Sequence, residues 1–499
     1  MYLIGLDLGT THLKAGLFGL DGGMLALATC LNPLHHSPEG YAYYPPEQLW
    51  QGVVRVLAEI LGACDGPVAA VGVTSMAETG LLVDLHTGAA RTPLLPWFDT
   101  AAAPAAQALS QQVDAGARFL RCGLRPTFKC SLAKLLWARQ QGLASLDGAV
   151  WLSTADYIVY RLCGILATDP SLAGRSYAFH IDTKEWDGEL LDALGLPVDI
   201  FPVVLPSGAP AGRARLGGCP ELARLNGAPV AVAGHDHICA ALAASLLAGG
   251  LRGDQVVDST GTAESLLGIL PERPLDTPAW QAGFSYGLFV LPGYLYWTGG
   301  LSSAGGAVEW LRAVLADPPL SYEALDALSG EKADPGHSDL FFLPYLAGRG
   351  APHSDPQARG VFYGLGLEHG RADLYRAVLE GVAYEIEWMR QAAEQAHGVE
   401  IRRLLATGGG TRNRRWMQMR ADVTGCQVEA LPQAQAATLG AAWLAGLGAG
   451  AFTDLADLQA QASQPALQSY WPNPPRHQAY LQGYQRFRRL AQAVQSDQV

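Results

Sequence analysis

Residues 2–18 read Y-L-I-G-L-D-L-G-T-T-H-L-K-A-G-L-F, and residues 255–270 read Q-V-V-D-S-T-G-T-A-E-S-L-L-G-I-L, half a chain away. Each copy is an apolar run, a Gly-Thr turn and a second apolar run, which predicts a β-hairpin. Aligning the two turns matches three pairs of residues: Gly9 with Gly261, Thr10 with Thr262 and Gly16 with Gly268. The repeat therefore predicts a duplicated domain.

The turns of these hairpins offer backbone N–H groups and hydroxyls. Neighbouring N–H groups form an anion-binding nest, so such a turn can cradle phosphate oxygens. Two copies predict a phosphate held between the two halves of the chain. The alternative is a pair of ordinary hairpins that need glycine at a tight bend.

The composition limits the function classes. Of 499 residues, 49% are hydrophobic and 16% charged, so two or three globular domains are expected. The net charge of −12 argues against nucleic acid as a partner, because phosphate backbones require clustered Lys and Arg. The sequence shows no C-x-x-C pair, no signal-peptide pattern and no uninterrupted membrane span. We therefore expect a reduced, cytoplasmic protein without a membrane partner.

A glycine-rich break, L-L-A-G-G-L-R-G-D, precedes the second hairpin and marks the expected main domain boundary. We expect an N-terminal domain over residues 1–248 and a C-terminal domain over residues 249–450. Residues 451–499 are expected to form a helical tail that packs on the core. No Walker A sequence occurs, so ATP binding would need a different architecture.

Asp7 ends the first predicted strand and directly precedes the Gly-Thr turn. A carboxylate beside a phosphate nest would repel phosphate unless a cation lies between them. Mg²⁺ needs hard oxygen ligands and usually keeps several waters. We therefore expect Asp7 to hold Mg²⁺ through water, with Lys14 neutralising phosphate charge. A purely turn-forming role for Asp7 is the alternative.

Asp236 lies in A-G-H-D-H, after a short apolar strand and before a predicted helix. An Asp at the end of a strand that faces a cleft can accept a proton from a substrate hydroxyl as a general base. The alternatives are a helix N-cap and a metal site that uses His235 and His237.

Two weaker signals concern the nucleotide and the substrate. T-G-G-G-T-R-N at residues 407–413 predicts a strand-to-helix turn that a ligand can approach closely. Candidate substrate contacts offer carboxylates for paired hydroxyls and an indole face for a sugar ring: Glu78, Thr79, Trp97 and Asp99. The alternatives are core packing for Trp97 and a solvated loop for Glu78.

These motifs resemble those of the FGGY carbohydrate kinases over essentially the whole chain. The most specific stretch is G-V-F-Y-G-L-G-L-E-H-G-R-A-D-L-Y-R-A-V-L-E at residues 360–380, preceded by P-Y-L-A-G-R-G-A-P at residues 344–352. D-L-G-T-T near the N-terminus, S-T-G-T at residues 259–262 and G-G-G-T-R-N-R-R-W at residues 408–416 also resemble family blocks.

The resemblance implies an α/β fold with two ribonuclease-H-like domains of the actin and hexokinase type, and with ATP and sugar bound in the cleft between them. It implies that Asp7 is the Mg·ATP aspartate, that Asp236 is the catalytic base and that His235 lies beside the substrate. The nucleotide-binding positions that it implies are Thr10, Thr11, Lys14, Thr260, Gly261, Thr262, Gly305, Gly408, Gly409 and Asn413. Dimers are common in the family, which makes a homodimer the assembly to test.

The departures from the family pattern lie on the substrate side. Many members carry W-x-D-x-R, whereas W-F-D-T-A here ends in Ala101. Glycerol kinases carry Q-R-E-T where this chain has M-A-E-T at residues 76–79, so the Glu is kept and the Arg is lost. Xylulokinases carry Q-M-H-G there and follow the base with Asn, whereas this chain has His237. The sugar is therefore left undetermined.

The expected activity is ATP-dependent phosphorylation of a hydroxyl on a small sugar or polyol. A ketopentose, as in xylulokinases, is the first expectation. A glycerol, tetritol or sugar-acid kinase of the same family is the alternative, and Glu78 favours the glycerol type. From other classes, the alternatives are an actin-like ATPase and a sugar-sensing pseudokinase.

Overall fold

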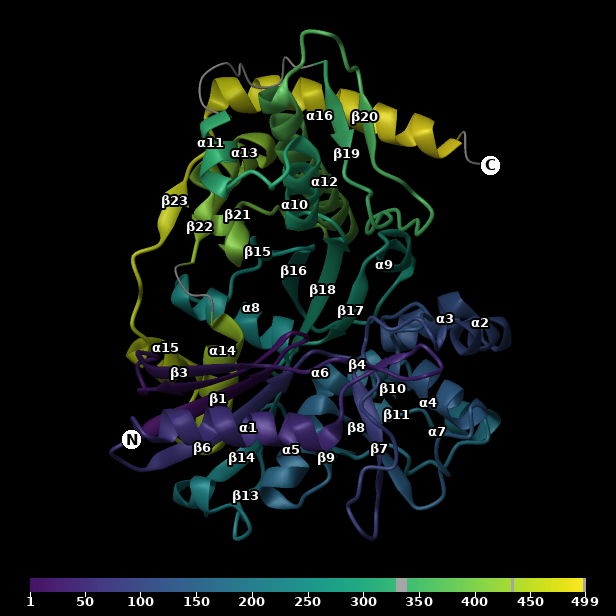
Figure 1. The fold of residues 1–499 in the computed structure, drawn as a ribbon, viewed down its shortest axis with the longest axis vertical. Coiled ribbons are helices and arrows are strands. Elements are labelled where there is room, and N and C mark those ends of the chain that lie inside the picture. The colour runs from purple at the N-terminus through teal and green to yellow at the C-terminus, as the bar shows by residue number, and fades with distance from the viewer. Residues whose placement is uncertain (329–338, 432–434, 497–499) are drawn as a thin grey trace.

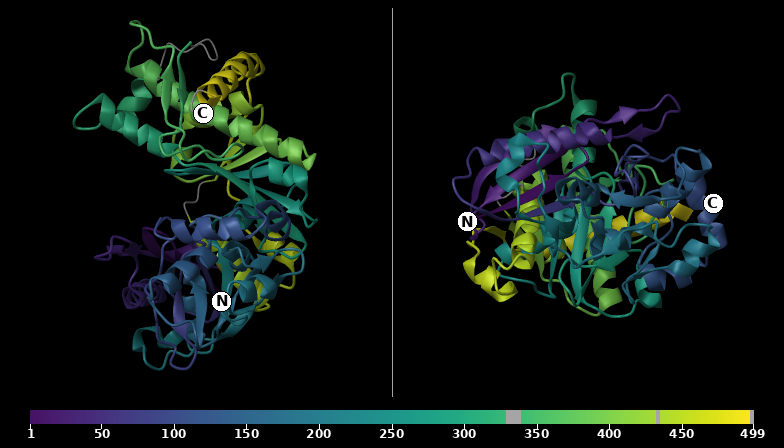
Figure 2. Two further views of the ribbon diagram at one scale, coloured as in Figure 1. Left: turned by 90° about the vertical axis from the view of Figure 1, so that its right-hand side faces the viewer. Right: turned by 90° about the horizontal axis from the view of Figure 1, so that it is seen from below.

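Two mixed β-sheets, one from each half of the chain, form the centres of two lobes that lie one above the other (Figures 1 and 2). The structure is a computed structural model, and it describes residues 1–328, 339–431 and 435–496. The N-terminus lies in the first lobe and the C-terminal helix lies in the second (Figure 1).

The first sheet has six strands in the order β13-β14-β6-β1-β2-β3. Its strands are β1 (Tyr2–Leu8), β2 (His12–Phe18), β3 (Met24–Leu31), β6 (Val68–Ser75), β13 (Pro210–Arg213) and β14 (Pro229–His235). The helices of this half are α1 (Pro46–Leu61), α2 (Ala103–Gln112), α3 (Ala115–Cys122), α4 (Ser131–Gln140), α5 (Thr154–Cys163), α6 (Pro170–Ala173), η1 (Gly174–Ser176), α7 (Gly188–Ala193), η2 (Pro220–Leu225) and α8 (Asp236–Leu247). The short strands are β4 (His35–His36), β5 (Ala42–Tyr43), β7 (Gly80–Asp84), β8 (Ala149–Ser153), β9 (Ala167–Thr168), β10 (Phe179–His180), β11 (Glu185–Trp186) and β12 (Val203–Val204).

The second sheet has seven strands in the order β17-β18-β16-β15-β21-β22-β23. Its strands are β15 (Gln255–Thr260), β16 (Glu264–Pro271), β17 (Ser285–Leu288), β18 (Tyr294–Leu301), β21 (Arg403–Thr407), β22 (Gln427–Ala430) and β23 (Gln468–Tyr470). A separate pair is β19 (Phe341–Leu343) with β20 (Val361–Tyr363). The helices are α9 (Thr277–Gln281), α10 (Gly305–Leu315), α11 (Tyr322–Leu328), α12 (Arg371–His397), η3 (Gly409–Arg412), α13 (Arg414–Thr424), α14 (Ala436–Gly448), α15 (Leu455–Gln461) and α16 (Pro474–Ser496).

The two sheets repeat one topology. In each sheet three antiparallel strands are followed by two parallel ones, so that β3-β2-β1-β6-β14 matches β18-β16-β15-β21-β22. The crossover helices pack on the sheet faces, as parallel strands require. This duplication confirms the expected α/β fold of two ribonuclease-H-like domains.

The register of the two hairpins corrects one detail of the sequence alignment. Residues 9–12 separate the paired Leu8 and Leu13, whereas only residues 261–263 separate the paired Thr260 and Glu264. The second turn is therefore one residue shorter. Gly16, which pairs with Gly5, consequently corresponds to Leu267 and not to Gly268, because Leu267 pairs with the residue that matches Gly5.

Helix α14 returns from the second half of the chain to the first sheet, where it packs on β1, β6 and α8 (Figure 1). Its small residues, A-A-T-L-G-A-A-W-L-A-G-L-G, allow a close approach of the backbones. Helix α16 instead packs on α12 and α13 in the second lobe. The proposed division into residues 1–248, 249–450 and 451–499 stays a prediction, with α14 as an element that crosses between the lobes.

We expect Gly72→Ala to destabilise the fold by about 1–3 kcal/mol, the usual cost of overpacking a filled core. A Cβ on Gly72 would lie 2.0 Å from the carbonyl oxygen of Ala441 in α14, so β6 and the helix would have to separate. Urea unfolding measures the loss. Gly217→Ala is the matched control, because a Cβ there meets nothing within 4 Å. Equal stability of the two variants would contradict close packing of α14.

Among the described residues, the structure contains no helix long and apolar enough to cross a membrane. The cytoplasmic location and the homodimer stay predictions.

Candidate active site between the lobes

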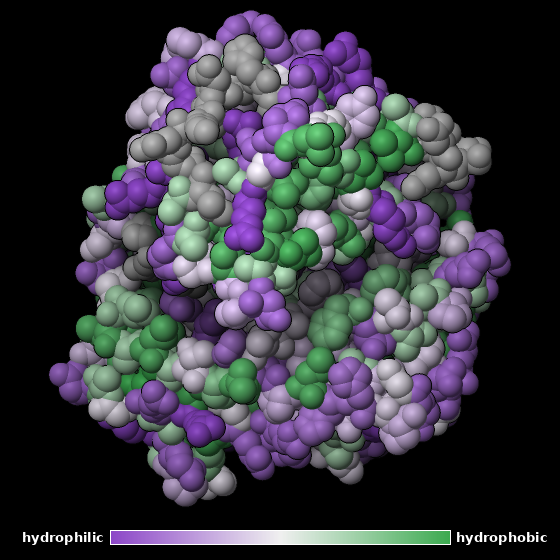
Figure 3. Space-filling model, turned by 45° about the horizontal axis from the view of Figure 1, so that its top comes forward, coloured by the Kyte–Doolittle hydropathy of each residue, from purple (hydrophilic) through white to green (hydrophobic). Residues whose placement is uncertain are grey.

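A cavity of about 260 Å³ is lined by residues of both lobes. In the space-filling view, a recessed band crosses the middle of the molecule between the two lobes (Figure 3). The first lobe contributes the end of β1, Lys14 of β2 and the start of α8, and the second contributes the β15–β16 hairpin and the end of β21. The residues that line the cavity include Asp7, Lys14, Asp236, His237, Ser259, Ser265, Thr407, Gly408, Ala436 and Ala437.

Asp7 and Lys14 face each other across the first hairpin. They are paired residues of β1 and β2, and Lys14 Nζ lies 3.8 Å from Asp7 Oδ2. Burial, together with the negative charge of Asp236, raises the pKa of Asp7 to about 7, and the positive charge of Lys14 acts in the opposite direction. Asp7 Oδ1 is buried without a hydrogen-bond partner. This carboxylate oxygen is therefore available to bind a cation.

These residues fit Mg²⁺. A buried carboxylate oxygen without a donor, close to a second carboxylate, is the hard oxygen site that Mg²⁺ takes when it keeps waters and substrate phosphates as its other ligands. Across residues 1–328, 339–431 and 435–496, no group of three or more His, Cys, Asp or Glu side chains could hold a metal. A metal site on His235 and His237 thus lacks a third ligand among these residues.

Asp236 is the first residue of α8 and directly follows β14. Its Oδ1 accepts a hydrogen bond from the His237 backbone N–H at 2.7 Å and lies 3.3 Å from His235 Nε2. Burial raises the pKa of Asp236, whereas burial lowers the pKa of His235 well below its usual value. A neutral His235 therefore lies beside the carboxylate without adding a positive charge.

A buried network that the sequence did not indicate holds the end of β14. Ser171 Oγ accepts a hydrogen bond from the His235 backbone N–H at 2.9 Å and donates to Asp169 Oδ2 at 2.8 Å. Ser207 Oγ also donates to Asp169 Oδ2, at 2.6 Å. His235, the residue before Asp236, is thus held in place by Ser171 of α6. The only sequence signal was the Asp-Pro-Ser start of that short helix.

Among the predicted nucleotide-binding positions, the second turn is hydrogen-bonded to the start of α10. The backbone N–H groups of Gly305 and Gly306 donate to the carbonyl oxygens of Gly261 and Thr262 at 3.0 and 2.9 Å. Thr11 and Thr262 lie exposed at the two turns. Ser259 stands where Asp7 stands in the first hairpin, and it lines the cavity.

The remaining nucleotide-side positions divide into two groups. Gly408 lines the cavity, and Gly409 has open space around it. Thr260 and Asn413 instead form hydrogen bonds within the protein. Thr260 is fully buried, and Asn413 caps α13 by accepting from the Trp416 backbone N–H at 2.9 Å.

The predicted substrate residues form a connected loop cluster. Thr79 Oγ1 accepts a hydrogen bond from the Trp97 backbone N–H at 3.1 Å, and Trp97 Nε1 donates to Thr10 Oγ1 at 3.0 Å. Asp99 accepts from the backbone N–H groups of Ala42 and Ala101 at 2.6 and 2.8 Å, so it fixes its own loop. Trp97 thereby connects the substrate loop to the first Gly-Thr turn.

Glu78 has two hydrogen-bond partners that the sequence did not indicate. Arg175 of η1 donates from Nε to Glu78 Oε1 at 2.8 Å and bonds the same oxygen through Nη2. Lys134 of α4 donates to the Glu78 carbonyl oxygen at 2.6 Å, and burial lowers the pKa of Lys134 to about 8. Glu78 has a φ of 60°, a left-handed conformation that these contacts hold in place. No spacing pattern in the sequence pointed to Arg175.

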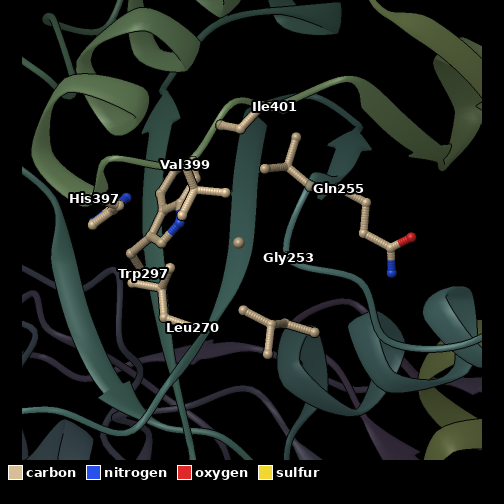
Figure 4. A pocket seen from close by; sticks show the side chains of 10 residues that line it. Gly253, Gln255, Leu270, Trp297, His397, Val399 and Ile401 are labelled. Atoms are coloured by element: carbon tan, nitrogen blue, oxygen red, sulfur yellow. The ribbon is translucent and has the colours of Figure 1, made fainter.

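A second cavity, shown in Figure 4, lies away from these residues, on the second sheet. Its wall includes Leu270, Trp297, His397 and Ile401. Its volume of about 10 Å³ is enough for one water at most, so it is not a ligand site.

His397 in this wall predicts a pH-dependent loss of stability. Burial lowers the pKa of His397 to about 4, with the positive charge of Arg273 acting in the same direction. The unfolded chain therefore binds more protons than the fold between pH 4 and 6.5, and stability falls as the pH drops through this window. His397→Gln should make that slope shallower by up to about 1.4 kcal/mol per pH unit, the slope for one proton.

Urea unfolding at pH 4.5, 5.5 and 6.5 checks this prediction. His36→Gln is the control, because His36 is exposed. A slope for His397→Gln that equals that of the wild type would show that His397 is not held neutral by the fold.

A duplicated ribonuclease-H-like fold with two carboxylates in one interlobe cavity places the chain in the actin and hexokinase fold class. The chain belongs to the FGGY family of carbohydrate kinases. The family's N-terminal domain matches residues 2–243, and its C-terminal domain matches residues 257–449. The protein is therefore a phosphotransferase with an alcohol group as acceptor.

Individual relatives bear different names. A glycerol kinase of Gloeobacter violaceus is 34% identical over 469 residues, which cover 92% of this chain and 90% of the relative. A xylulose kinase of Bacillus subtilis is 29% identical over 491 residues, which cover 96% of this chain and 94% of the relative. The crystal structure of a xylulose kinase from Rhodospirillum rubrum superposes with a TM-score of 0.88 at 27% identity, and covers 99% of both chains.

Proposed function

We propose that this protein transfers the γ-phosphoryl group of ATP, as its Mg²⁺ complex, to a hydroxyl of a small polyol or ketose. The observation that carries the proposal is the meeting of Asp7 and Asp236 in one cavity with Ser259 of the second hairpin. The residues proposed to bind the phosphates, to bind the cation and to accept the proton thus come from both lobes. Closure of the lobes around the substrates would exclude water from the transferring group.

In the proposed mechanism, Asp236 accepts the proton of the substrate hydroxyl. The hydroxyl oxygen forms a bond to the γ-phosphorus, the bond from that phosphorus to the β–γ bridging oxygen breaks, and ADP leaves with the electron pair. Asp236 is suited to this role because burial raises its pKa, which favours uptake of a proton, and His235 Nε2 lies 3.3 Å from it. Lys14 and the donors of the two turns stabilise the phosphate charge. When bound at Asp7, Mg²⁺ neutralises charge on the phosphates.

A glycerol-type polyol is the substrate that the site favours over the ketopentose expected from the sequence. Glycerol kinases carry an Arg next to the Glu that Glu78 matches, and this chain has Ala77 there. The structure supplies a guanidinium to Glu78 from Arg175 instead. A carboxylate and a guanidinium side by side can bind adjacent hydroxyls, one by accepting and the other by donating. The 34% identity to a glycerol kinase supports the same substrate class.

A coupled assay of ADP release tests the proposal. The panel contains glycerol, erythritol, D-xylulose, D-ribulose and gluconate, each with Mg·ATP and the full chain. We expect glycerol or the tetritol to give the highest kcat/KM, and mass spectrometry to show one added phosphate. If a ketopentose gave the highest kcat/KM, the substrate class would be a ketopentose and not a glycerol-type polyol. ADP release that no acceptor stimulates would support the ATPase alternative, and nucleotide binding without turnover the pseudokinase alternative.

A further inference from the structure

A fully buried cluster of charged groups lies behind the second Gly-Thr turn. Arg420 of α13 is completely buried and bonds Asp258 of β15 through Nη1. Its Nη1 donates to Glu264 Oε1 at 2.7 Å, and its Nη2 donates to Glu264 Oε2 at 3.0 Å. Asp258 and Glu264 stand on the two strands of the hairpin. One guanidinium therefore ties α13 to both strands.

Thr260 completes this cluster with its hydroxyl. Thr260 Oγ1 donates to Glu264 Oε1 at 2.9 Å and accepts from Arg420 Nη1 at 2.8 Å. The single hydroxyl proton is used inside the protein, and the residue has no exposed surface. Thr260 is also not among the residues that line the cavity.

Thr260 also packs directly against the glycine-rich turn after β21. A Cβ on Gly408 would lie 2.4 Å from the Thr260 carbonyl oxygen, and a Cβ on Gly410 would lie 2.1 Å from Thr260 Cγ2. Only glycine permits this contact between the two turns. The helix that follows the glycine-rich turn is α13, which carries Arg420. The second hairpin and the glycine-rich turn are thus joined twice, through Thr260 and through Arg420.

We propose that Thr260 and Arg420 form a buried clasp that fixes the separation of the turns at residues 261–263 and 408–410. Because these turns face the nucleotide in the proposed function, on which this inference rests, the clasp sets the affinity for a nucleoside diphosphate. Thr260 is a positioning residue in this view, and it acts through Arg420. A direct contact between the Thr260 hydroxyl and a phosphate, as the sequence motif implies, is the competing explanation.

The first test compares Thr260→Val with Thr260→Ser by isothermal titration of the full chain with Mg·ADP. Valine keeps the methyl group near Gly410 but removes the hydroxyl, so we expect the Kd for ADP to rise about tenfold. Serine keeps the hydroxyl, so we expect a change of about twofold or less. The KM of the acceptor should stay within about twofold for both variants, because its pocket lies on the other lobe.

The second test repeats Thr260→Val in an Arg420→Lys background, where the charge is kept and the guanidinium fork is lost. If Thr260 acts through Arg420, the valine substitution should now raise the Kd for ADP by less than about twofold. An equal factor in both backgrounds would show a direct phosphate contact and overturn the clasp. Should Arg420→Lys not fold, Glu264→Gln provides the second background, because Glu264 receives the Thr260 hydroxyl.

The outcomes separate the clasp from the proposed function. A wild-type chain that binds no Mg·ADP overturns the proposed function and the clasp with it. A wild-type chain that binds Mg·ADP, with a folded Thr260→Val variant of unchanged affinity, overturns the clasp alone. Circular dichroism and a thermal melt of each variant show that the fold is retained.

Discussion

An Asp236→Asn variant is expected to lose turnover by about 10²–10⁴-fold, the usual contribution of a general base. Asparagine has the shape of aspartate, and its carbonyl oxygen can still accept from the His237 backbone N–H, as Asp236 Oδ1 does at 2.7 Å. It cannot take a proton from the substrate hydroxyl. The KM of the acceptor should change little, and the Kd for Mg·ADP should fall if it changes, because one negative charge leaves the cavity.

Steady-state rates of ADP release and a titration with Mg·ADP measure these quantities. Asp254→Asn is the matched control, since Asp254 pairs with Arg252 at the surface and lies outside the cavity lining. We expect the control to keep turnover within about twofold, as surface substitutions do. More than about a tenth of wild-type turnover in Asp236→Asn would remove Asp236 from the role of base.

An Arg175→Lys variant is expected to raise the KM of the acceptor by about 30–100-fold, which corresponds to the loss of roughly 2–3 kcal/mol of charge-assisted hydrogen bonds. Arg175 holds Glu78 Oε1 through Nε and Nη2, and its Nη1 is buried without a partner. Lysine keeps the positive charge but cannot form the two-pronged contact and also donate to a substrate hydroxyl.

The kinetic signature distinguishes this role from general damage to the fold. The KM for ATP should stay within about twofold, because Arg175 is not among the residues that line the cavity with Asp7 and Ser259. Arg213→Lys is the control, since its Nη1 donates only to an exposed backbone carbonyl, that of Gly227. If Arg175→Lys raised the two KM values equally, Arg175 would support the cleft as a whole and not the acceptor site.

Much of the fold could be predicted because its signals are local. The two Gly-Thr hairpins, the strand-to-helix turn at residues 407–413 and the strand before Asp236 follow from apolar runs and from glycine at turns. The one-residue difference between the hairpin turns could not be predicted in this way, because both copies contain the same residue types and the register depends on the pairing of the strands.

Within the candidate site, residues at strand ends were predictable and their partners were not. Asp7 and Asp236 meet because β1 and β14 run parallel, with β6 between them, and end at the same edge of the sheet, whereas Lys14 is paired with Asp7 on the antiparallel strand β2. Arg175 approaches Glu78 from 97 residues further along the chain, on a turn with no motif that indicated it.

The sequence by itself determined the duplication, the α/β class and the carboxylates of the cavity, since each depends on residues close together in the chain. Only the tertiary structure decided which hydrogen-bond partners the threonine hydroxyls at the two turns have. At the first turn, Thr10 Oγ1 accepts a hydrogen bond from Trp97 Nε1. Its counterpart at the second turn, Thr262, is exposed, whereas Thr260, just before that turn, is bonded to Glu264 and Arg420. The reason is burial: two carboxylates enclosed in the second hairpin must be neutralised and hydrogen-bonded, and the nearest hydroxyl is drawn into that network. The two Gly-Thr turns are alike in sequence, and their different surroundings give them different roles.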